Sequence, residues 1–232
     1  MSLYGVIASI DGNREALAAV LAALEGRGAR RIACLGGIVG YNADPDECVA
    51  LVRSRCAAAI AGEHDLISLG KLGFRRCSTE AEYALRRTRR ELSAASRAYL
   101  AALPWRQALD DGIVLGDGID TPPRICFVAS GREAKVREIE GDRQREIPAQ
   151  GAVQLRAGAA YLVNPGSVDG SRKGGRKLAE CALYDSRGGT LEFLRVPYDN
   201  AATEAKAAVF GYRINPLAGG LYTLRRRLAA RF

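Results

Sequence analysis

The sequence predicts an α/β protein, and two parts of the chain indicate this independently. In the first third, short apolar runs alternate with helical patterns in the order strand, helix, strand, helix, strand. Beyond residue 104, short strand-like runs separated by Gly, Pro and Asp are typical of a mostly antiparallel sheet. The 232 residues, of which 48% are hydrophobic, suit one domain with a sizeable core. We therefore expect a single domain over residues 1–232, with residues 200–232 as a C-terminal helical extension.

The N-terminal third divides into five elements, each with its own signal. An apolar run over Leu3–Ile10 predicts a buried strand that ends at the turn Asp11-Gly12-Asn13. Apolar residues at helical spacing between Arg14 and Arg27 predict a helix that Asn13 caps. The next elements are a strand over Ile32–Leu35, a helix opened by Asp44-Pro45 and a strand over Ala57–Ala61. Such alternation predicts parallel strands joined by helical crossovers.

The rest of the chain predicts one long helix, a strand-rich region and two closing helices. The long helix covers Thr79–Ala102, and Leu103-Pro104 ends it. The expected strands are Ile113–Leu115, Ile125–Val128, Val136–Ile139, Tyr161–Val163, Leu178–Tyr184 and Leu191–Val196. Ala201–Phe210 and Leu217–Ala230 are the closing helices, and the glycine-rich stretch Gly166–Gly175 is expected to be a mobile loop.

Composition narrows the possible partners and the cellular setting. The 34 Lys and Arg residues against 26 Asp and Glu give a net charge of +8, which favours anionic partners. No run of 18 apolar residues is present, and no basic region precedes the first strand, so neither a membrane span nor a signal peptide is expected. Six cysteines without a C-x-x-C pair, together with a single histidine, exclude a Cys/His zinc cluster and suggest no disulfide framework. We predict a reducing, cytoplasmic setting.

Polar turns follow three of the expected strands. They are Ile7–Asn13, Cys34–Tyr41 and Gly62–Asp65. Because open α/β sheets bind ligands at the carboxyl ends of their strands, these three turns predict the pocket of the protein.

In order and spacing, these turns resemble the motifs of the calcineurin-like metallophosphoesterases, in particular the small bacterial and archaeal branch. That family reads S-D-I-H-G-N, then C-L-G-D-L-V-G-Y followed by P-D-P, then G-N-H-D and later N-P-G-S-V. Here Asn164-Pro165-Gly166-Ser167-Val168 is intact, and Val196-Pro197-Tyr198-Asp199 matches the branch's run into its last helices. The resemblance spans almost the whole chain. It implies a four-layer αββα sandwich of two mixed sheets and phosphatase or phosphodiesterase chemistry with two divalent metals.

Most residues that would hold those metals are replaced. Carried over by position, the family's first Asp falls on Ser9, its first His on Asp11, its bridging Asp on Gly37 and its motif-three Asn on Glu63. The later His positions fall on Leu115, Ser130 and Arg132. His64 and Asp65 are retained, and the resemblance implies that His64 donates a proton to the leaving group while Asp65 orients it.

We therefore expect an inactive relative without metals. The guanidinium of Arg132 repels a cation and attracts a phosphate, and Asn13 at a helix N-terminus is a second candidate for anion binding. The segment between Leu115 and Ser130 is shorter than in the family, which predicts that a wall of the pocket is cut away. The expected partner is a phosphate-bearing small molecule or an acidic protein.

Three alternatives remain open from the residues. One divalent cation, such as Mg, Mn or Fe, could be held by Asp11, Glu63 and Asp65, with Asp117 as a further ligand, giving a divergent phosphodiesterase or phosphatase. These carboxylates could equally be ordinary turn residues, and His64-Asp65 could be retained for packing. RNA could bind the arginine clusters Arg86–Arg90 and Arg225–Arg227, although the low aromatic content, 6%, gives this weak support.

Overall fold

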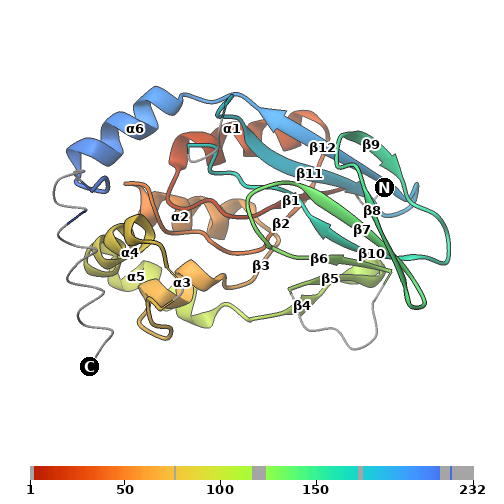
Figure 1. Ribbon diagram of the computed structural model, residues 1–232, viewed down its shortest axis with the longest axis horizontal. Helices are drawn as coiled ribbons and strands as arrows, with labels where there is room; N and C mark the ends of the chain where they lie inside the picture. Colours follow the sequence, from red (N-terminus) through yellow and green to blue (C-terminus); the bar gives the residue numbers. More distant parts are fainter. Residues whose placement is uncertain (1–2, 76, 117–123, 172–174, 215–219, 221–232) are drawn as a thin grey trace.

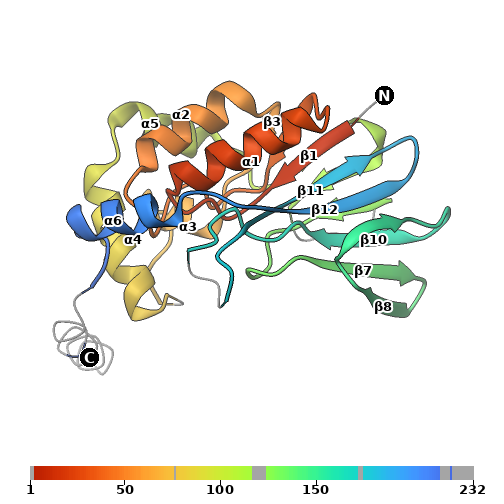
Figure 2. The ribbon, with the colours of Figure 1, turned by 90° about the horizontal axis from the view of Figure 1, so that it is seen from above.

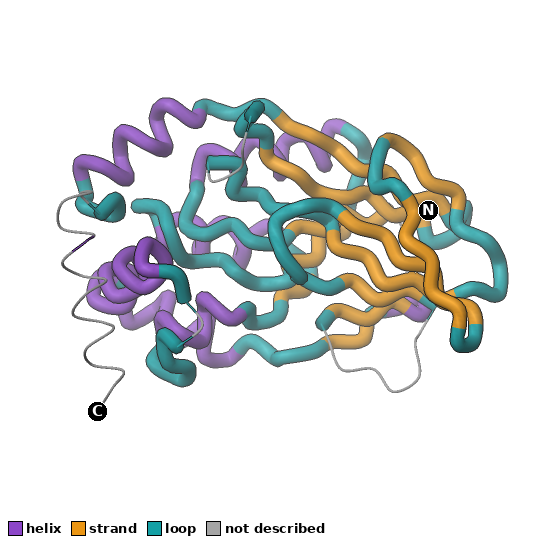
Figure 3. Tube along the Cα trace, viewed as in Figure 1, coloured by secondary structure: helices purple, strands orange, loops and turns teal. Residues whose placement is uncertain are grey.

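The computed structural model describes residues 3–75, 77–116, 124–171, 175–214 and 220. Two mixed sheets of six strands each pack face to face, and six α-helices accompany them within these residues (Figure 1). Figure 3 shows the strands gathered on one side of the molecule and most helices on the other. The predicted α/β fold of two mixed sheets is confirmed.

Sheet A contains the N-terminal strands. Its order is β3-β2-β1-β11-β12-β9. The strands are β1 Leu3–Ile7, β2 Arg31–Cys34, β3 Ala58–Ala59, β9 Gly151–Gln154, β11 Ala179–Asp185 and β12 Thr190–Val196. The first three are parallel, as their helical crossovers predict, and the others join antiparallel. The carboxyl ends of β1, β2 and β3 therefore meet at one edge.

Sheet B is built from the second half of the chain. Its order is β4-β5-β6-β10-β7-β8. The strands are β4 Gln107–Ala108, β5 Ile113–Leu115, β6 Ile125–Phe127, β7 Lys135–Glu140, β8 Arg143–Ile147 and β10 Ala160–Asn164. The β5–β6 and β6–β10 pairs are parallel and the rest of this sheet is antiparallel. Together with the antiparallel pairs β11–β12 and β12–β9 of sheet A, this confirms that the second half of the chain is mostly antiparallel.

Apolar side chains fill two layers of core, one on each face of sheet A. Val6, Leu35 and Tyr184 meet Leu115 and Phe127 between the sheets. On the other face, the strands pack against α1 Arg14–Gly26 and α2 Pro45–Arg55 through a second cluster that includes Ile7, Leu17, Leu21, Cys34 and Val52. Figure 2 shows α1 and α2 lying over sheet A. The segment between β5 and β6 contains residues 117–123, which lie outside the described residues, so the expected loss of a pocket wall after Leu115 stays a prediction.

The remaining helices frame the end of the sheets where the carboxyl ends of β1–β3 lie. They are α3 Glu63–Ser68, α4 Thr79–Glu91, α5 Ala94–Ala102 and α6 Asn200–Val209, and a 3₁₀ turn covers Asp110–Gly112. The single long helix expected over Thr79–Ala102 is wrong. It is two helices because the chain becomes extended at Leu92, and the Ser93 hydroxyl then caps α5 by accepting from the Ser96 N–H (3.2 Å).

The loop expected over Gly166–Gly175 packs against the sheets in its described first part. Residues 166–171 of the expected mobile loop are buried against the end of β1, where the Val168 N–H donates to the Ala8 carbonyl (2.9 Å). The closing helix expected at Leu217–Ala230 lies outside the described residues, apart from position 220. All six cysteines are free thiols. Within the described residues, no helix has the length and apolar character needed to cross a membrane.

Candidate functional site

A cavity of about 610 Å³ opens at the carboxyl ends of β1, β2 and β3. Six of the positions singled out from the sequence line it, namely Ser9, Asp11, Gly37, Glu63, His64 and Arg132. Its other walls come from Leu35, Ile60, Ala61, Gly62, Leu72, Trp105, Gly116, Ala129 and Gly131. The structure thus brings together the three turns that the sequence predicted as the pocket.

The turns after β1 and β2 are joined by backbone hydrogen bonds. The Ser9 N–H donates to the Gly36 carbonyl (3.0 Å), and the Ile10 N–H donates to the Gly37 carbonyl (2.7 Å). Ser9 and Asp11 both adopt left-handed backbone conformations, with φ of 53° and 54°. Non-glycine residues seldom do so, and such strain concentrates at ligand sites. The surrounding hydrogen bonds hold these two residues in place at the cavity.

Asp65 holds the turn after β2 together. The side chain is fully buried, and its two oxygens accept from the backbone N–H groups of Gly37 (2.9 Å), Ile38 (2.9 Å), Val39 (3.1 Å) and Gly62 (2.8 Å). Burial raises the pKa of Asp65 to about 6, while the N–H donors act in the opposite direction by favouring the charged form. Both oxygens are committed to the backbone, so the expectation that Asp65 orients His64 is wrong.

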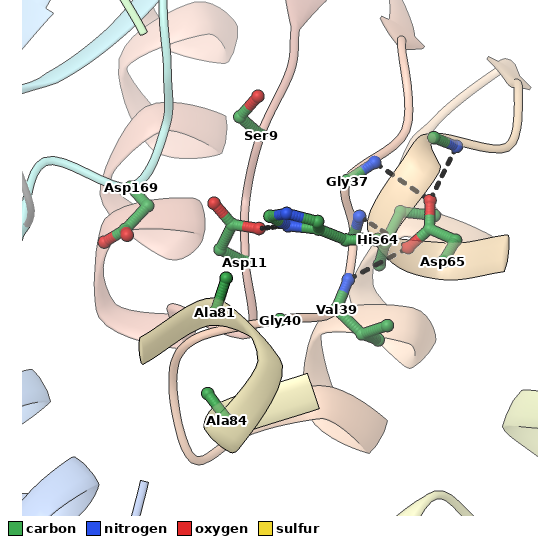
Figure 4. A network of polar contacts seen from close by, with 12 residues as sticks. Ser9, Asp11, Gly37, Val39, Gly40, His64, Asp65, Ala81, Ala84 and Asp169 are labelled. Carbon is green, nitrogen blue, oxygen red and sulfur yellow. Dashed lines mark hydrogen bonds and ion pairs between the residues drawn. The ribbon is translucent and has the colours of Figure 1, made fainter. Parts of the chain in front are cut away.

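His64 is oriented by Asp11 instead. The His64 Nδ1 lies 2.7 Å from the Asp11 Oδ1, and the imidazole packs in a T-shaped arrangement with the Tyr41 ring. Figure 4 shows the Asp11 and His64 side chains facing each other. Burial opposes protonation of the ring, but the Asp11 carboxylate outweighs it and raises the pKa of His64 above its ordinary value. The sequence carried one signal for this pair: Asp11 is a carboxylate at the position where the resemblance places the family's first histidine, in a turn expected beside that of His64.

We expect the pKa of His64 to lie above its usual value of about 6.5, and to fall below it in Asp11→Asn, because burial then dominates. Because His64 is the only histidine, a proton NMR titration can follow its imidazole signals without a resonance assignment. A raised pKa in the folded state stabilises the fold fully below about pH 6.5 and ceases to do so as the pH rises through that pKa. The matched control is Glu63→Gln, which removes an exposed neighbouring carboxylate and should move the midpoint less. A wild-type midpoint below 6.5 contradicts the pairing.

Gly37 is the residue on which the family resemblance places the bridging carboxylate. Its φ is 65°, and a Cβ there would lie 3.1 Å from the Ser9 Cα. Gly36 lies even closer to its neighbour, since a Cβ would come within 2.2 Å of the Gly62 N. The turns after β2 and β3 therefore pack backbone against backbone.

Several predicted site residues lie elsewhere. Leu115 faces the core between the sheets, so the next residue, Gly116, lines the cavity in its place. Ser130 lines a separate small pocket with Lys135 and Arg137. Asn13 caps α1 as predicted, but it is buried, with Oδ1 accepting from the Ala16 N–H (3.0 Å) and Nδ2 donating to Asp169 (2.8 Å). Because both ends of its side chain are engaged, Asn13 is wrong as an anion-binding residue. Asp117 lies outside the described residues.

The arginines of α4 make contacts within the protein. Arg86 stacks on Phe74, with 4.4 Å from its guanidinium carbon to the ring centroid, and pairs with Glu82. Arg87 pairs with Glu91, and Arg89 donates to the Ile67 carbonyl. The second cluster, Arg225–Arg227, lies outside the described residues. The α4 cluster thus contributes to packing, and RNA binding stays a prediction without further support.

Comparison with known proteins places this geometry in a family. No family model matches the chain. It is 30% identical over 222 residues to the uncharacterized protein MJ0912 of Methanocaldococcus jannaschii, covering 85% of this chain and 88% of that protein.

Two solved structures have the same fold. The metallophosphoesterase of Sphaerobacter thermophilus superposes with a TM-score of 0.74 at 24% identity, over 95% of this chain and 98% of the other. The hypothetical protein PH1004 of Pyrococcus horikoshii OT3 superposes with a TM-score of 0.68 at 21% identity, over 92% and 95%. With its fold, its ordered motifs and this relative, the chain belongs to the calcineurin-like metallophosphoesterase family, in its small bacterial and archaeal branch.

Proposed function

We propose that this protein is a non-catalytic member of the family that binds a phosphate-bearing small molecule in the cavity. The observation that carries the proposal is the structure around Gly37. Where the family has a carboxylate shared by two cations, this chain has a backbone N–H that donates to the buried Asp65 (2.9 Å). Two cations held about 3.5–4 Å apart need such a shared ligand, and they supply both the nucleophile and the charge stabilisation of the reaction.

The other donors do not fit the metal cluster either. Ser9 offers a hydroxyl, Asp11 is engaged by His64, and Glu63 is exposed at the cavity. Among the described residues, no three His, Cys, Asp or Glu side chains come together as a metal site. Asp11, Glu63 and Asp65 also fit a single cation poorly. Asp65 accepts hydrogen bonds from four backbone N–H groups, so its oxygens are not available as metal ligands. Without Asp65, two of these carboxylates remain among the described residues for a hard cation, which takes about six oxygens.

The same side chains suit an anion. His64, whose pKa the Asp11 carboxylate raises against the effect of burial, and Arg132 both line the cavity. A guanidinium and an imidazolium are strong donors to phosphate oxygens. Glu63 opposes them with a negative charge. A concave cavity of about 610 Å³ lies in the range of small-molecule sites, which favours a small ligand over an acidic protein partner. The free thiols accord with a cytoplasmic location, which we also propose.

The test measures metal content, hydrolysis and binding on the same purified protein. We expect no stoichiometric Mn, Fe, Zn or Ni by elemental analysis, and no turnover of bis(p-nitrophenyl) phosphate with added Mn²⁺ beyond that of His64→Ala. Inorganic phosphate should bind, and Arg132→Ala should weaken it about tenfold, the effect of one charge-assisted hydrogen bond. The matched control is Arg137→Ala, an exposed arginine outside the cavity. Robust turnover that vanishes in His64→Ala would overturn the proposal.

A further inference from the structure

Two exposed apolar side chains gather at the cavity. Of the described residues, only four large hydrophobic side chains are markedly exposed: Leu72 (40%), Trp105 (58%), Val209 (80%) and Phe210 (53%). Leu72 and Trp105 both line the cavity. An indole left exposed beside a cavity that carries His64 and Arg132 indicates a contact for a ligand rather than for the protein core.

The backbone that carries Trp105 is fixed on both sides. The carbonyl of Pro104 accepts from the Ala61 N–H (2.9 Å), which ties the segment to the end of β3. On the other side, a Cβ on Gly116 would lie 2.9 Å from the Trp105 carbonyl oxygen, so the residue after β5 has to be glycine for the two to meet. Trp105 is therefore presented by a rigid scaffold, and a ligand stacked on it loses little free energy in ordering the protein.

We propose that the ligand is a nucleoside phosphate, with its phosphate at His64 and Arg132 and its base stacked on Trp105; this rests on the proposed function. Among the residues that line the cavity, His64 and Arg132 can donate to an anion, and Trp105 is aromatic and exposed. The face of an indole binds planar bases by stacking and does not distinguish strongly between one base and another. Leu35, Ile60 and Leu72 add apolar surface to the same cavity. A volume of about 610 Å³ accommodates one mononucleotide.

The experiment compares ligands that differ only in the base. AMP and ribose 5-phosphate are titrated by calorimetry into the full chain, and Trp105 is the only tryptophan, so its fluorescence reports a stacked base directly. We expect AMP to bind about tenfold more tightly than ribose 5-phosphate and to quench the fluorescence. Trp105→Ala should abolish that preference while leaving the affinity for ribose 5-phosphate unchanged, and Trp105→Phe should keep part of it.

Phe210→Ala is the matched control, because this exposed aromatic residue follows α6 and does not line the cavity. Equal affinities for AMP and ribose 5-phosphate in the wild type, or an AMP preference that survives in Trp105→Ala, overturn the nucleotide assignment alone. Phosphate binding that depends on Arg132 then still supports the proposed function. If neither AMP nor ribose 5-phosphate binds, and Arg132→Ala changes nothing, both proposals fail.

Discussion

Asp65→Ala is expected to lower the free energy of unfolding by about 3–5 kcal/mol, because it leaves four backbone N–H groups, two of them in buried hydrogen bonds, without their acceptor. Hydrogen bonds to a charged group are worth about 1.5–3 kcal/mol each, and their loss is partly offset by water entering the space. Asp65→Asn keeps one oxygen acceptor and should cost about 2 kcal/mol. Chemical denaturation followed by circular dichroism measures both changes.

The matched control for Asp65 is Asp110→Ala. Asp110 is an exposed carboxylate, 74% accessible, that pairs with Arg31 at the surface. Surface pairs contribute about 0–1 kcal/mol, so its removal should be almost neutral. If Asp65→Ala is too unstable to purify, Asp65→Asn still tests the role of the carboxylate. A change of less than 1 kcal/mol in Asp65→Asn and Asp65→Ala alike would contradict that role.

Elements with local sequence signals were predicted, whereas elements without such signals were missed. α1 was predicted closely because its apolar spacing and its Asn13 cap are both local signals. β8, Arg143–Ile147, was missed because it is an exposed edge strand whose residues are mostly charged and show no apolar alternation. The break between α4 and α5 was missed because Ser93 ends one helix and caps the next without a Gly or Pro to mark it.

In the candidate site, the sequence predicted the positions of most residues but not the contacts between them. Its positions followed from ordered motifs, and the structure brings Ser9, Asp11, Gly37, Glu63 and His64 to one cavity. The pairing of Asp11 with His64 was missed, although both turns were expected at one pocket, because only the folded chain shows which carboxylate faces the imidazole. Trp105 was missed for a similar reason. Its place depends on how the segment after α5 passes Ala61 and Gly116, which no local pattern records.

Gly36→Ala is expected to destabilise the protein by at least about 3 kcal/mol, because two separate costs add. Its φ of +81° costs an L-residue about 1–2 kcal/mol, and a Cβ at 2.2 Å from the Gly62 N would force the two turns apart. Gly28→Ala is the matched control, since Gly28 has φ +83° and open space around its Cβ position. Gly28→Ala should be destabilised only by the conformational cost. The difference in the free energy of unfolding between the two variants therefore measures the contact between the turns.

The same variant tests what holds the site together. Separating Gly36 from Gly62 also pulls the Gly37 N–H away from Asp65, which lies in the same turn as Gly62, so the imidazole of His64 should move with its turn. We expect the His64 proton signals to shift in Gly36→Ala and to stay in place in Gly28→Ala. Equal destabilisation and unchanged His64 signals in the two variants would contradict the contact. A large difference means that backbone contacts and one buried carboxylate hold the two turns together.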